Sequence, residues 1–185
     1  MVMEQYRLNV LRHSNSASPI KHNIELLDIL TQLPRRQCVE ENLKLSYRKF
    51  EAEDCDFCII LVDLDNCREI NDRHGREAGD LALTKLGQML RNELRENYIA
   101  GRWSGNQFIL ILPEISQNIA AAIAERIRQK ACLIDLFFHT DTLEITLSIG
   151  VCSTENSSGL DDLLTTAENC VYQAKQMGRN MVIGS

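Results

Sequence analysis

A short apolar run that ends in acidic residues constrains the fold of this chain more than any other feature. Residues 57–62, with the sequence FCIILV, are continuously apolar, and Asp63-Leu64-Asp65 follows at once. A run of this length, with acidic residues on both sides, is typical of a strand buried on both faces of a sheet. The run therefore predicts a central strand whose end carries carboxylates.

Patterns of apolar residues around this strand predict further elements. Helices are expected from near Ile24 until Pro34 interrupts, over 36–52, around 81–90, over 116–131 and over 161–177. Strands are expected over 99–103, 108–112, 143–151 and 181–183. Residues 99–103 and 108–112 flank a turn that contains Gly105, which predicts a hairpin. Gly178 is expected to end the last helix.

This order of elements predicts an α+β fold, with a sheet of ferredoxin-like or nucleotidyl-cyclase-palm type and helices on one face. A doubly wound sheet would need helices between all strands and a glycine-rich first turn, and the sequence has neither. The length of 185 residues fits one domain. Residues 1–22 are polar and without periodicity, so we expect a flexible leader or linker there and the domain over 23–185.

Composition excludes several classes of function. A net charge of −6 argues against a protein that coats nucleic acid or an anionic membrane. The sequence shows neither a run long enough for a membrane span nor a signal peptide, which predicts a cytoplasmic protein. Seven cysteines without a regular pattern predict reduced thiols, and the pair Cys55 and Cys58 lacks the further ligands of a zinc site.

The acidic end of the predicted central strand is a candidate metal site. Alternation along a strand sends Asp63 and Asp65 to the same face, and Mg²⁺ prefers oxygen ligands. Acids that simply end a strand are common, so this pair alone leaves both interpretations open. The neighbouring hairpin turn should supply a second acid, but it offers Asn106 and Gln107. Their neutral amides bring no negative charge to balance a divalent ion and cannot act as a general base.

Six motifs, in order along residues 26–185, resemble those of the GGDEF family, whose active members join two GTP molecules into cyclic di-GMP. They are 27–36 (LDILTQLPRR), 63–72 (DLDNCREIND), 75–80 (GREAGD), 102–108 (RWSGNQF), 146–150 (TLSIG) and 167–180 (AENCVYQAKQMGRN). The resemblance implies a GGDEF or nucleotidyl-cyclase palm-like fold, in which a mainly antiparallel sheet with a ferredoxin-like core is surrounded by helices. It also implies a bacterial signalling protein.

The resemblance assigns roles to residues whose chemistry is retained. It implies guanine binding by Asn71 and Asp80, phosphate binding by Arg68, Lys175 and Arg179, and a metal site formed by Asp63 and the backbone carbonyl of Leu64. Lys175 and Arg179, four residues apart, are expected to share one face at a helix end. The alternatives are that Asp80 caps a helix starting at Leu81 and that both cations only complement a helix dipole.

The signature that names the family is changed. Ser104, Asn106 and Gln107 stand where the family has glycine and two acids, so we expect no catalytic residues and no cyclase activity. The family's product site also departs, because Tyr98 replaces the aspartate that accompanies Arg95. We expect Tyr98 to be an exposed hairpin residue and cyclic di-GMP to bind poorly.

Three functions remain open from the sequence. The first, which we favour, is an inactive GGDEF-like domain that binds GTP, holds Mg²⁺ weakly and acts on a protein partner or a fused signalling domain. The second is a protein-interaction module with an empty pocket. The third is a weak residual diguanylate cyclase.

Overall fold

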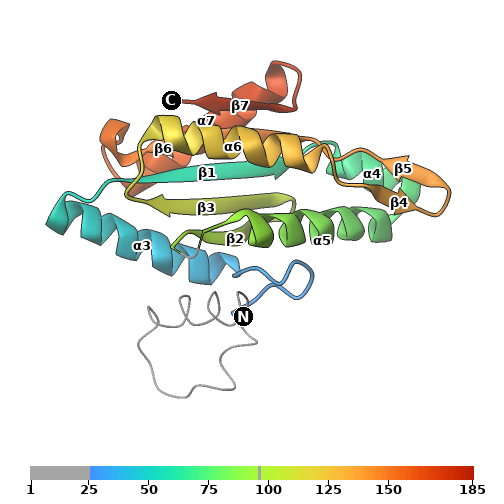
Figure 1. Ribbon diagram of the computed structural model, residues 1–185, viewed down its shortest axis with the longest axis horizontal. Coiled ribbons are helices and arrows are strands. Elements are labelled where there is room, and N and C mark those ends of the chain that lie inside the picture. Colours follow the sequence, from blue (N-terminus) through green and yellow to red (C-terminus); the bar gives the residue numbers. More distant parts are fainter. Residues whose placement is uncertain (1–25, 96) are drawn as a thin grey trace.

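A five-stranded sheet forms the middle of the molecule in the computed structural model, which describes residues 26–95 and 97–185 (Figure 1). The strands are β1 (Phe57–Leu64), β2 (Ile99–Ser104), β3 (Gln107–Pro113), β6 (Leu147–Ser153) and β7 (Met181–Gly184), and they lie in the order β2-β3-β1-β6-β7. Every neighbouring pair is antiparallel except β6 and β7, which are parallel. The predicted mainly antiparallel α+β sheet is confirmed, with the apolar run of β1 at its centre.

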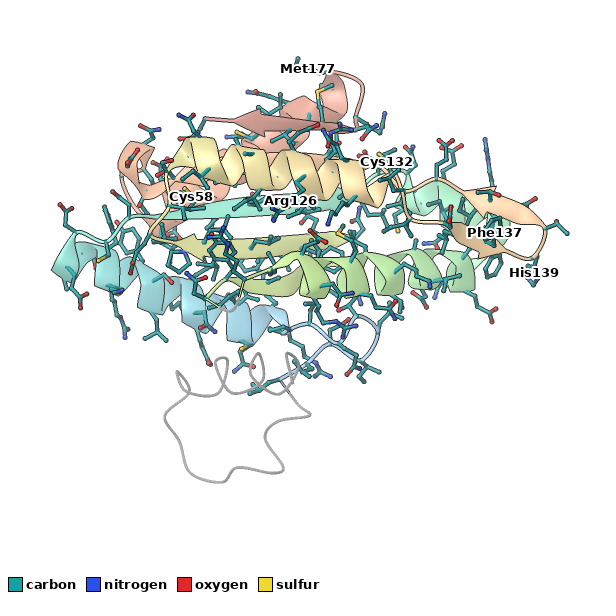
Figure 2. The ribbon with its side chains drawn as sticks, in the orientation of Figure 1. Cys58, Arg126, Cys132, Phe137, His139 and Met177 are labelled. Atoms are coloured by element: carbon teal, nitrogen blue, oxygen red, sulfur yellow. The ribbon has the colours of Figure 1, made fainter. Side chains whose placement is uncertain are left out.

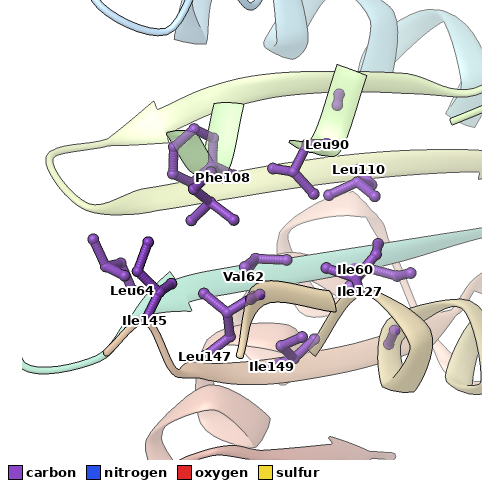
Figure 3. Packing of buried hydrophobic residues seen from close by; sticks show 14 of the residues in the cluster. Ile60, Val62, Leu64, Leu90, Phe108, Leu110, Ile127, Ile145, Leu147 and Ile149 are labelled. Carbon is purple, nitrogen blue, oxygen red and sulfur yellow. The ribbon is translucent and has the colours of Figure 1, made fainter. Parts of the chain in front are cut away.

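Helices cover both faces of this sheet, so the prediction of helices on one face is wrong. They are α3 (Arg36–Glu53), α4 (Cys67–His74), α5 (Arg76–Glu93), α6 (Gln117–Ala131) and α7 (Leu160–Gln176). Alternate side chains of β1 enter two apolar clusters: Ile60 and Val62 pack with residues of α5 and α6 (Figure 3), and Ile59 and Leu61 pack with residues of α3 and α7. A strand that is apolar at every position needs such a partner on each face.

Residues 26–35 form a turn, and the helix expected before Pro34 is absent from this described segment. Leu27 and Pro34 make an isolated antiparallel bridge, and the Asp28 amide donates to the Leu33 carbonyl over 2.8 Å. The Asp28 carboxylate accepts from both the amide and the hydroxyl of Thr31, a local bond that competes with helix formation. The start of this expected helix and the whole of the predicted leader, 1–22, lie outside the described residues.

The region expected to form one strand over 143–151 is divided between two strands, because Leu143 ends a small separate hairpin. Strands β4 (Leu136–Phe138) and β5 (Asp141–Leu143) form a separate two-stranded sheet, and β6 begins only at Leu147. Phe137 and His139 project from this hairpin (Figure 2). A short 3₁₀ helix, η1 (Thr154–Asn156), follows β6. No helix in the described part of the chain is both long and apolar enough to cross a membrane.

The start of α5 and the end of α7 determine where the predicted site residues Asp80 and Arg179 lie. Helix α5 begins at Arg76, directly after Gly75 with its φ of +87°, so Asp80 lies inside the helix and does not cap it. Helix α7 ends at Gln176, and Gly178 with a φ of +118° terminates it as predicted. The Arg179 amide then donates to the Ala174 carbonyl over 2.9 Å. Arg179 therefore lies beyond the helix and shares no helix face with Lys175.

Candidate functional site

A cleft of about 510 Å³ opens where the end of β1, the β2–β3 turn and the end of α7 meet. Its walls are formed by Leu64, Asn66, Cys67, Arg68, Glu69, Asp72, Arg73, Asn106, Lys175 and Arg179. The three predicted phosphate-binding residues therefore line one cleft, with Arg68 coming from α4 and Lys175 and Arg179 from the end of α7 and the segment after it. That they bind phosphate stays a prediction.

The cations of α4 are paired with acids of the same helix. Arg68 lies 3.7 Å from Asp72, and Arg73 lies 2.7 Å from Glu69. These side chains are largely exposed, so the pairs are weak in water and their cations can turn toward a ligand. The wall of the cleft therefore offers positive charge that a bound anion could recruit.

Asp63 lies beneath the cleft, with only 2% of its surface exposed. The register between β1 and β3 places Gln107 directly opposite Asp63. Gln107 Nε2 donates to Asp63 Oδ2 over 3.0 Å, and Lys175 Nζ lies 2.8 Å from the same oxygen. Asn106 Nδ2 donates to Asp63 Oδ1 over 2.8 Å. The carboxylate predicted to hold a metal is therefore surrounded by hydrogen-bond donors of this chain.

The other predicted metal ligand, the carbonyl of Leu64, is bound in the same way. Asn106 Nδ2 also donates to this oxygen over 2.9 Å. Asp63 and its partners Asn106, Gln107 and Lys175 form one cluster. Ser104 Oγ donates to Gln107 Oε1 over 2.8 Å and so connects to this cluster. The three residues that depart from the expected signature, Ser104, Asn106 and Gln107, all take part in one network around Asp63.

Asp65 has a separate set of partners, although it shares a face with Asp63. Its carboxylate accepts from the hydroxyls of Thr146 and Ser148, over 2.9 and 2.7 Å, and from the amide of Asn180 over 3.1 Å. These bonds tie the end of β1 to the start of β6 and to the segment that carries Arg179. Asp65 thus has a structural role, and we call these three bonds the Asp65 clamp.

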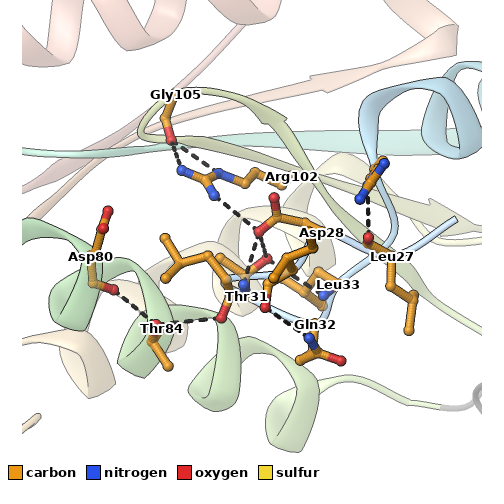
Figure 4. Close-up of polar contacts among 12 residues, drawn as sticks. Leu27, Asp28, Thr31, Gln32, Leu33, Asp80, Thr84, Arg102 and Gly105 are labelled. Atoms are coloured by element: carbon orange, nitrogen blue, oxygen red, sulfur yellow. Dashed lines mark hydrogen bonds and ion pairs between the residues drawn. The ribbon is translucent and has the colours of Figure 1, made fainter. Parts of the chain in front are cut away.

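The two predicted guanine-binding residues lie outside the wall of the cleft, on neighbouring helices. Asn71 is on α4 and Asp80 is exposed on α5, where its backbone carbonyl accepts from Thr84 Oγ1 over 2.8 Å (Figure 4). Among the described residues, Asn71 Oδ1 is the only buried side-chain nitrogen or oxygen atom without a hydrogen-bond partner. It packs against Gly79, where an added Cβ would lie 2.1 Å from it. The glycine is required for this position of Asn71.

An ion pair that the sequence does not reveal holds the hairpin turn in place. Arg102 Nη1 lies 3.0 Å from Asp28 Oδ1, while Arg102 Nε and Nη2 donate to the Gly105 carbonyl over 3.1 and 2.7 Å (Figure 4). The pair therefore connects the N-terminal turn to the turn that carries Asn106. Both residues lie in the motifs quoted above, but spacing alone does not show that they meet.

Arg95 and Tyr98, where we expect the family's product site to be degenerate, lie in different surroundings. Tyr98 is 3% exposed and belongs to the apolar cluster beneath α5 and α6, so the expectation of an exposed hairpin residue is wrong. Arg95 is exposed, and its carbonyl accepts from the Tyr98 amide over 3.1 Å. An aromatic side chain at this position is better placed in the apolar core than in water.

In the part of the chain that the structure describes, the cysteines and histidines form no metal site. All seven cysteines are free thiols, as predicted. Burial raises the pKa of Cys58 to about 11, and its Sγ donates to the Ile115 carbonyl over 3.3 Å. Within residues 26–95 and 97–185, no group of three or more histidine, cysteine or acidic side chains could hold a metal ion.

Comparison with known proteins agrees with the fold and the motifs. The family described as "Diguanylate cyclase, GGDEF domain" matches residues 25–181. Diguanylate cyclase DgcP of Pseudomonas aeruginosa is 30% identical over 155 residues, which cover 84% of this chain and 23% of that protein. The uncharacterized protein YhcK of Bacillus subtilis is 34% identical over 158 residues, with 84% and 44% covered. The chain therefore spans less than half the length of these curated relatives.

A solved structure shows the same architecture. The GGDEF domain of PA1120 (YfiN or TpbB) from Pseudomonas aeruginosa superposes with a TM-score of 0.78 at 30% identity. The match covers 84% of this chain and 98% of that one.

Proposed function

The chain belongs to the GGDEF family of diguanylate cyclase domains, and on that premise we propose that it is a catalytically inactive member. We infer that it binds GTP and regulates cyclic di-GMP signalling. The observation that carries the proposal is which side chains surround Asp63 and line the cleft. Its catalytic acids are replaced by amides that bond to Asp63, while the cations Arg68, Lys175 and Arg179 still converge on it.

The absence of cyclase activity follows from what amides can do. Phosphoryl transfer needs charge to position a metal ion and a group that accepts the proton of the attacking hydroxyl. Asn106 and Gln107 supply neither, and both direct their NH₂ groups toward Asp63. Losing both acids should lower the rate by about 10³-fold or more.

The binding of GTP is supported by the size and charge of the cleft. Ligand pockets typically enclose about 300–1,000 Å³, and this cleft of about 510 Å³ lies within that range. Positive charges from α4 and from the end of α7 line it, which suits a triphosphate. Asp80 is exposed on α5 and can accept from the N1–H and N2–H₂ donors of guanine, which adenine lacks. A donor that reached Asn71 Oδ1 would also satisfy an unpaired acceptor.

The test is a calorimetric titration with GTP and ATP. We expect GTP to bind at least about tenfold more tightly, because an acceptor left unpaired costs about 1–3 kcal/mol. Asp80→Ala should abolish this preference, whereas Glu77→Ala, which removes an exposed acid from the same helix, should leave it unchanged. Lys175→Ala and Arg179→Ala should weaken GTP and ATP equally.

A protein-interaction module with an empty cleft is the second candidate, and one observation favours it. Lys175 already pairs with Asp63, and Arg68 lies beside Asp72, so much of the positive charge is balanced without a ligand. If a folded sample binds neither nucleotide at millimolar concentration, this candidate replaces the first. In either case we propose that a protein partner or a fused signalling domain reads the state of the chain, since its relatives are much longer.

A further inference from the structure

The metal ion that the family implies would have to bind the carboxylate of Asp63 and the carbonyl of Leu64. A divalent cation such as Mg²⁺ needs oxygen ligands whose lone pairs are free to face it. In this chain the lone pairs face hydrogen-bond donors, so the residues present do not fit the ion.

The amide nitrogen of Asn106 lies between the two oxygens that would hold the cation. It is 2.8 Å from Asp63 Oδ1 and 2.9 Å from the Leu64 carbonyl oxygen. Both partners can only accept hydrogen bonds, so the side chain must present its NH₂ group to them. The two hydrogens of this group therefore point at the atoms that a metal ion would need.

The second oxygen of Asp63 is also bound. Gln107 Nε2 lies 3.0 Å from Oδ2, and Lys175 Nζ lies 2.8 Å from it. The hydroxyl of Ser104 donates to Gln107 Oε1, which fixes the orientation of that amide. Each of the changed signature residues thus contributes to an arrangement in which protein donors satisfy Asp63.

The charges of this cluster are balanced without an ion. Asp63 is 2% exposed, and the positive charge of Lys175 offsets its negative charge. If positions 106 and 107 were acidic, the cluster would carry a net negative charge that a divalent cation could balance. As it stands, a cation would have to displace Asn106 and lie beside an ammonium group, which repulsion in a buried setting opposes.

We propose that Asn106, Gln107 and Lys175 take the place of the metal ion, and that the cleft accepts a nucleoside triphosphate that carries no divalent cation. The nucleotide half of this inference rests on the proposed function, whereas the exclusion of the metal stands on the cluster alone. Arg179 and Arg68 then face the phosphates, with the negative charge of Asp63 already neutralised by Lys175.

The exclusion of the metal is tested with Mn²⁺ alone, by electron paramagnetic resonance. Wild-type protein should leave the signal of free Mn²⁺ unchanged up to millimolar concentration. The double variant N106D/Q107E should bind Mn²⁺ at least about tenfold more tightly, because it restores the oxygen ligands and the charge. The matched control N169D/Q173E makes the same two changes on the exposed surface of α7 and should behave as wild type.

Circular dichroism shows whether each variant is folded, and N106D alone serves if the double variant is not. Binding of Mn²⁺ by wild-type protein that is lost in Asp63→Asn would overturn the proposal. So would a folded N106D/Q107E variant that gains no affinity for Mn²⁺.

The nucleotide half is tested by titrating GTP in the presence of Mg²⁺ and in EDTA. The two dissociation constants should agree within about twofold, whereas a tenfold loss in EDTA would show that the ion takes part in binding. If GTP does not bind under either condition, the proposed function fails, and the Mn²⁺ titration still decides whether the cluster excludes a metal.

Discussion

At the scale of single residues, Asp28 is held by donors from two segments of the chain. Its Oδ1 accepts from the Thr31 amide over 2.8 Å, from the Thr31 hydroxyl over 2.7 Å and from Arg102 Nη1 over 3.0 Å. Burial alone would raise the pKa of this carboxyl, but the bonds from Thr31 and Arg102 outweigh it and lower the pKa. The stability that ionised Asp28 provides is therefore present above the ordinary aspartate pKa of about 3.9 and is lost as the pH falls through the lower pKa of the folded protein.

The substitution Asp28→Asn should lower the free energy of unfolding by about 1–2 kcal/mol at pH 7, because the charge-assisted bond to Arg102 is lost. The difference from wild type should shrink at acidic pH, as the pH falls through the lowered pKa of folded Asp28 and protonation removes the same charge. Urea denaturation at both pH values measures it. Asp54→Asn, at an exposed position, should change stability by less than about 0.5 kcal/mol. An effect of Asp28→Asn that is equal at both pH values would contradict this account.

The sequence indicates some of the residues that meet at the cleft, but it places Asn71 and Asp80 there although they lie outside its wall, and it does not show how the residues bond. Asp63, Lys175 and Arg179 were placed together through their motifs, and the structure brings them together. That Asn106 and Lys175 would turn toward Asp63 depends on the strand register and on the position of α7. Those are properties of the assembled fold, and residue types alone do not contain them.

At the scale of elements, the segment before β2 contributes a side chain to the core. The resemblance to the family places a ligand surface at the same position. Tyr98, with 3% of its surface exposed, packs in the cluster that includes Leu86 and Leu90 of α5. An aromatic side chain buried in this way stabilises the fold by several kcal/mol, so the packing of the core depends on the ring of Tyr98.

Replacing Tyr98 with aspartate should therefore not restore a cyclic di-GMP site. The change removes a buried ring and places a carboxylate in the core, which should cost at least about 3 kcal/mol in unfolding free energy. Tyr172→Asp, at a position that is 63% exposed, should have little effect. Urea denaturation measures the first effect, and calorimetry should show poor binding of cyclic di-GMP to wild type. Low-micromolar binding that is lost on Arg95→Ala would show that a site survives.

Long elements were predicted well because their periodicity extends over many residues. Helix α3 was expected over 36–52 and spans Arg36–Glu53, and the β2–β3 hairpin has its predicted turn. The β4–β5 hairpin was missed because strands of three residues are too short for alternation to be visible. The covering of both faces could be deduced from β1 itself, whose unbroken apolar run requires it.

At the scale of the whole molecule, cyclisation joins two GTP molecules and so requires a complete reaction site. We predict that the purified chain, incubated with GTP and either Mg²⁺ or Mn²⁺, makes no cyclic di-GMP above the level of a heat-denatured sample. The reason is that Asn106 and Gln107 can neither hold the ion by charge nor accept a proton. Chromatography of the products checks it, and turnover near the enzyme median of about 10 per second would restore the cyclase interpretation.

The Asp65 clamp also bears on the order in which the protein folds. Its partners Thr146, Ser148 and Asn180 are separated from it by 81, 83 and 115 positions in the sequence. Contacts over such distances form late, because the chain between them must first lose much of its conformational freedom. The local hairpin β2–β3 can pair early, whereas Arg179 reaches the wall of the cleft only once β7 has docked beside β6. The cleft is thus completed after the local parts of the domain have formed, and a ligand of the cleft would recognise only domains in which β7 has docked.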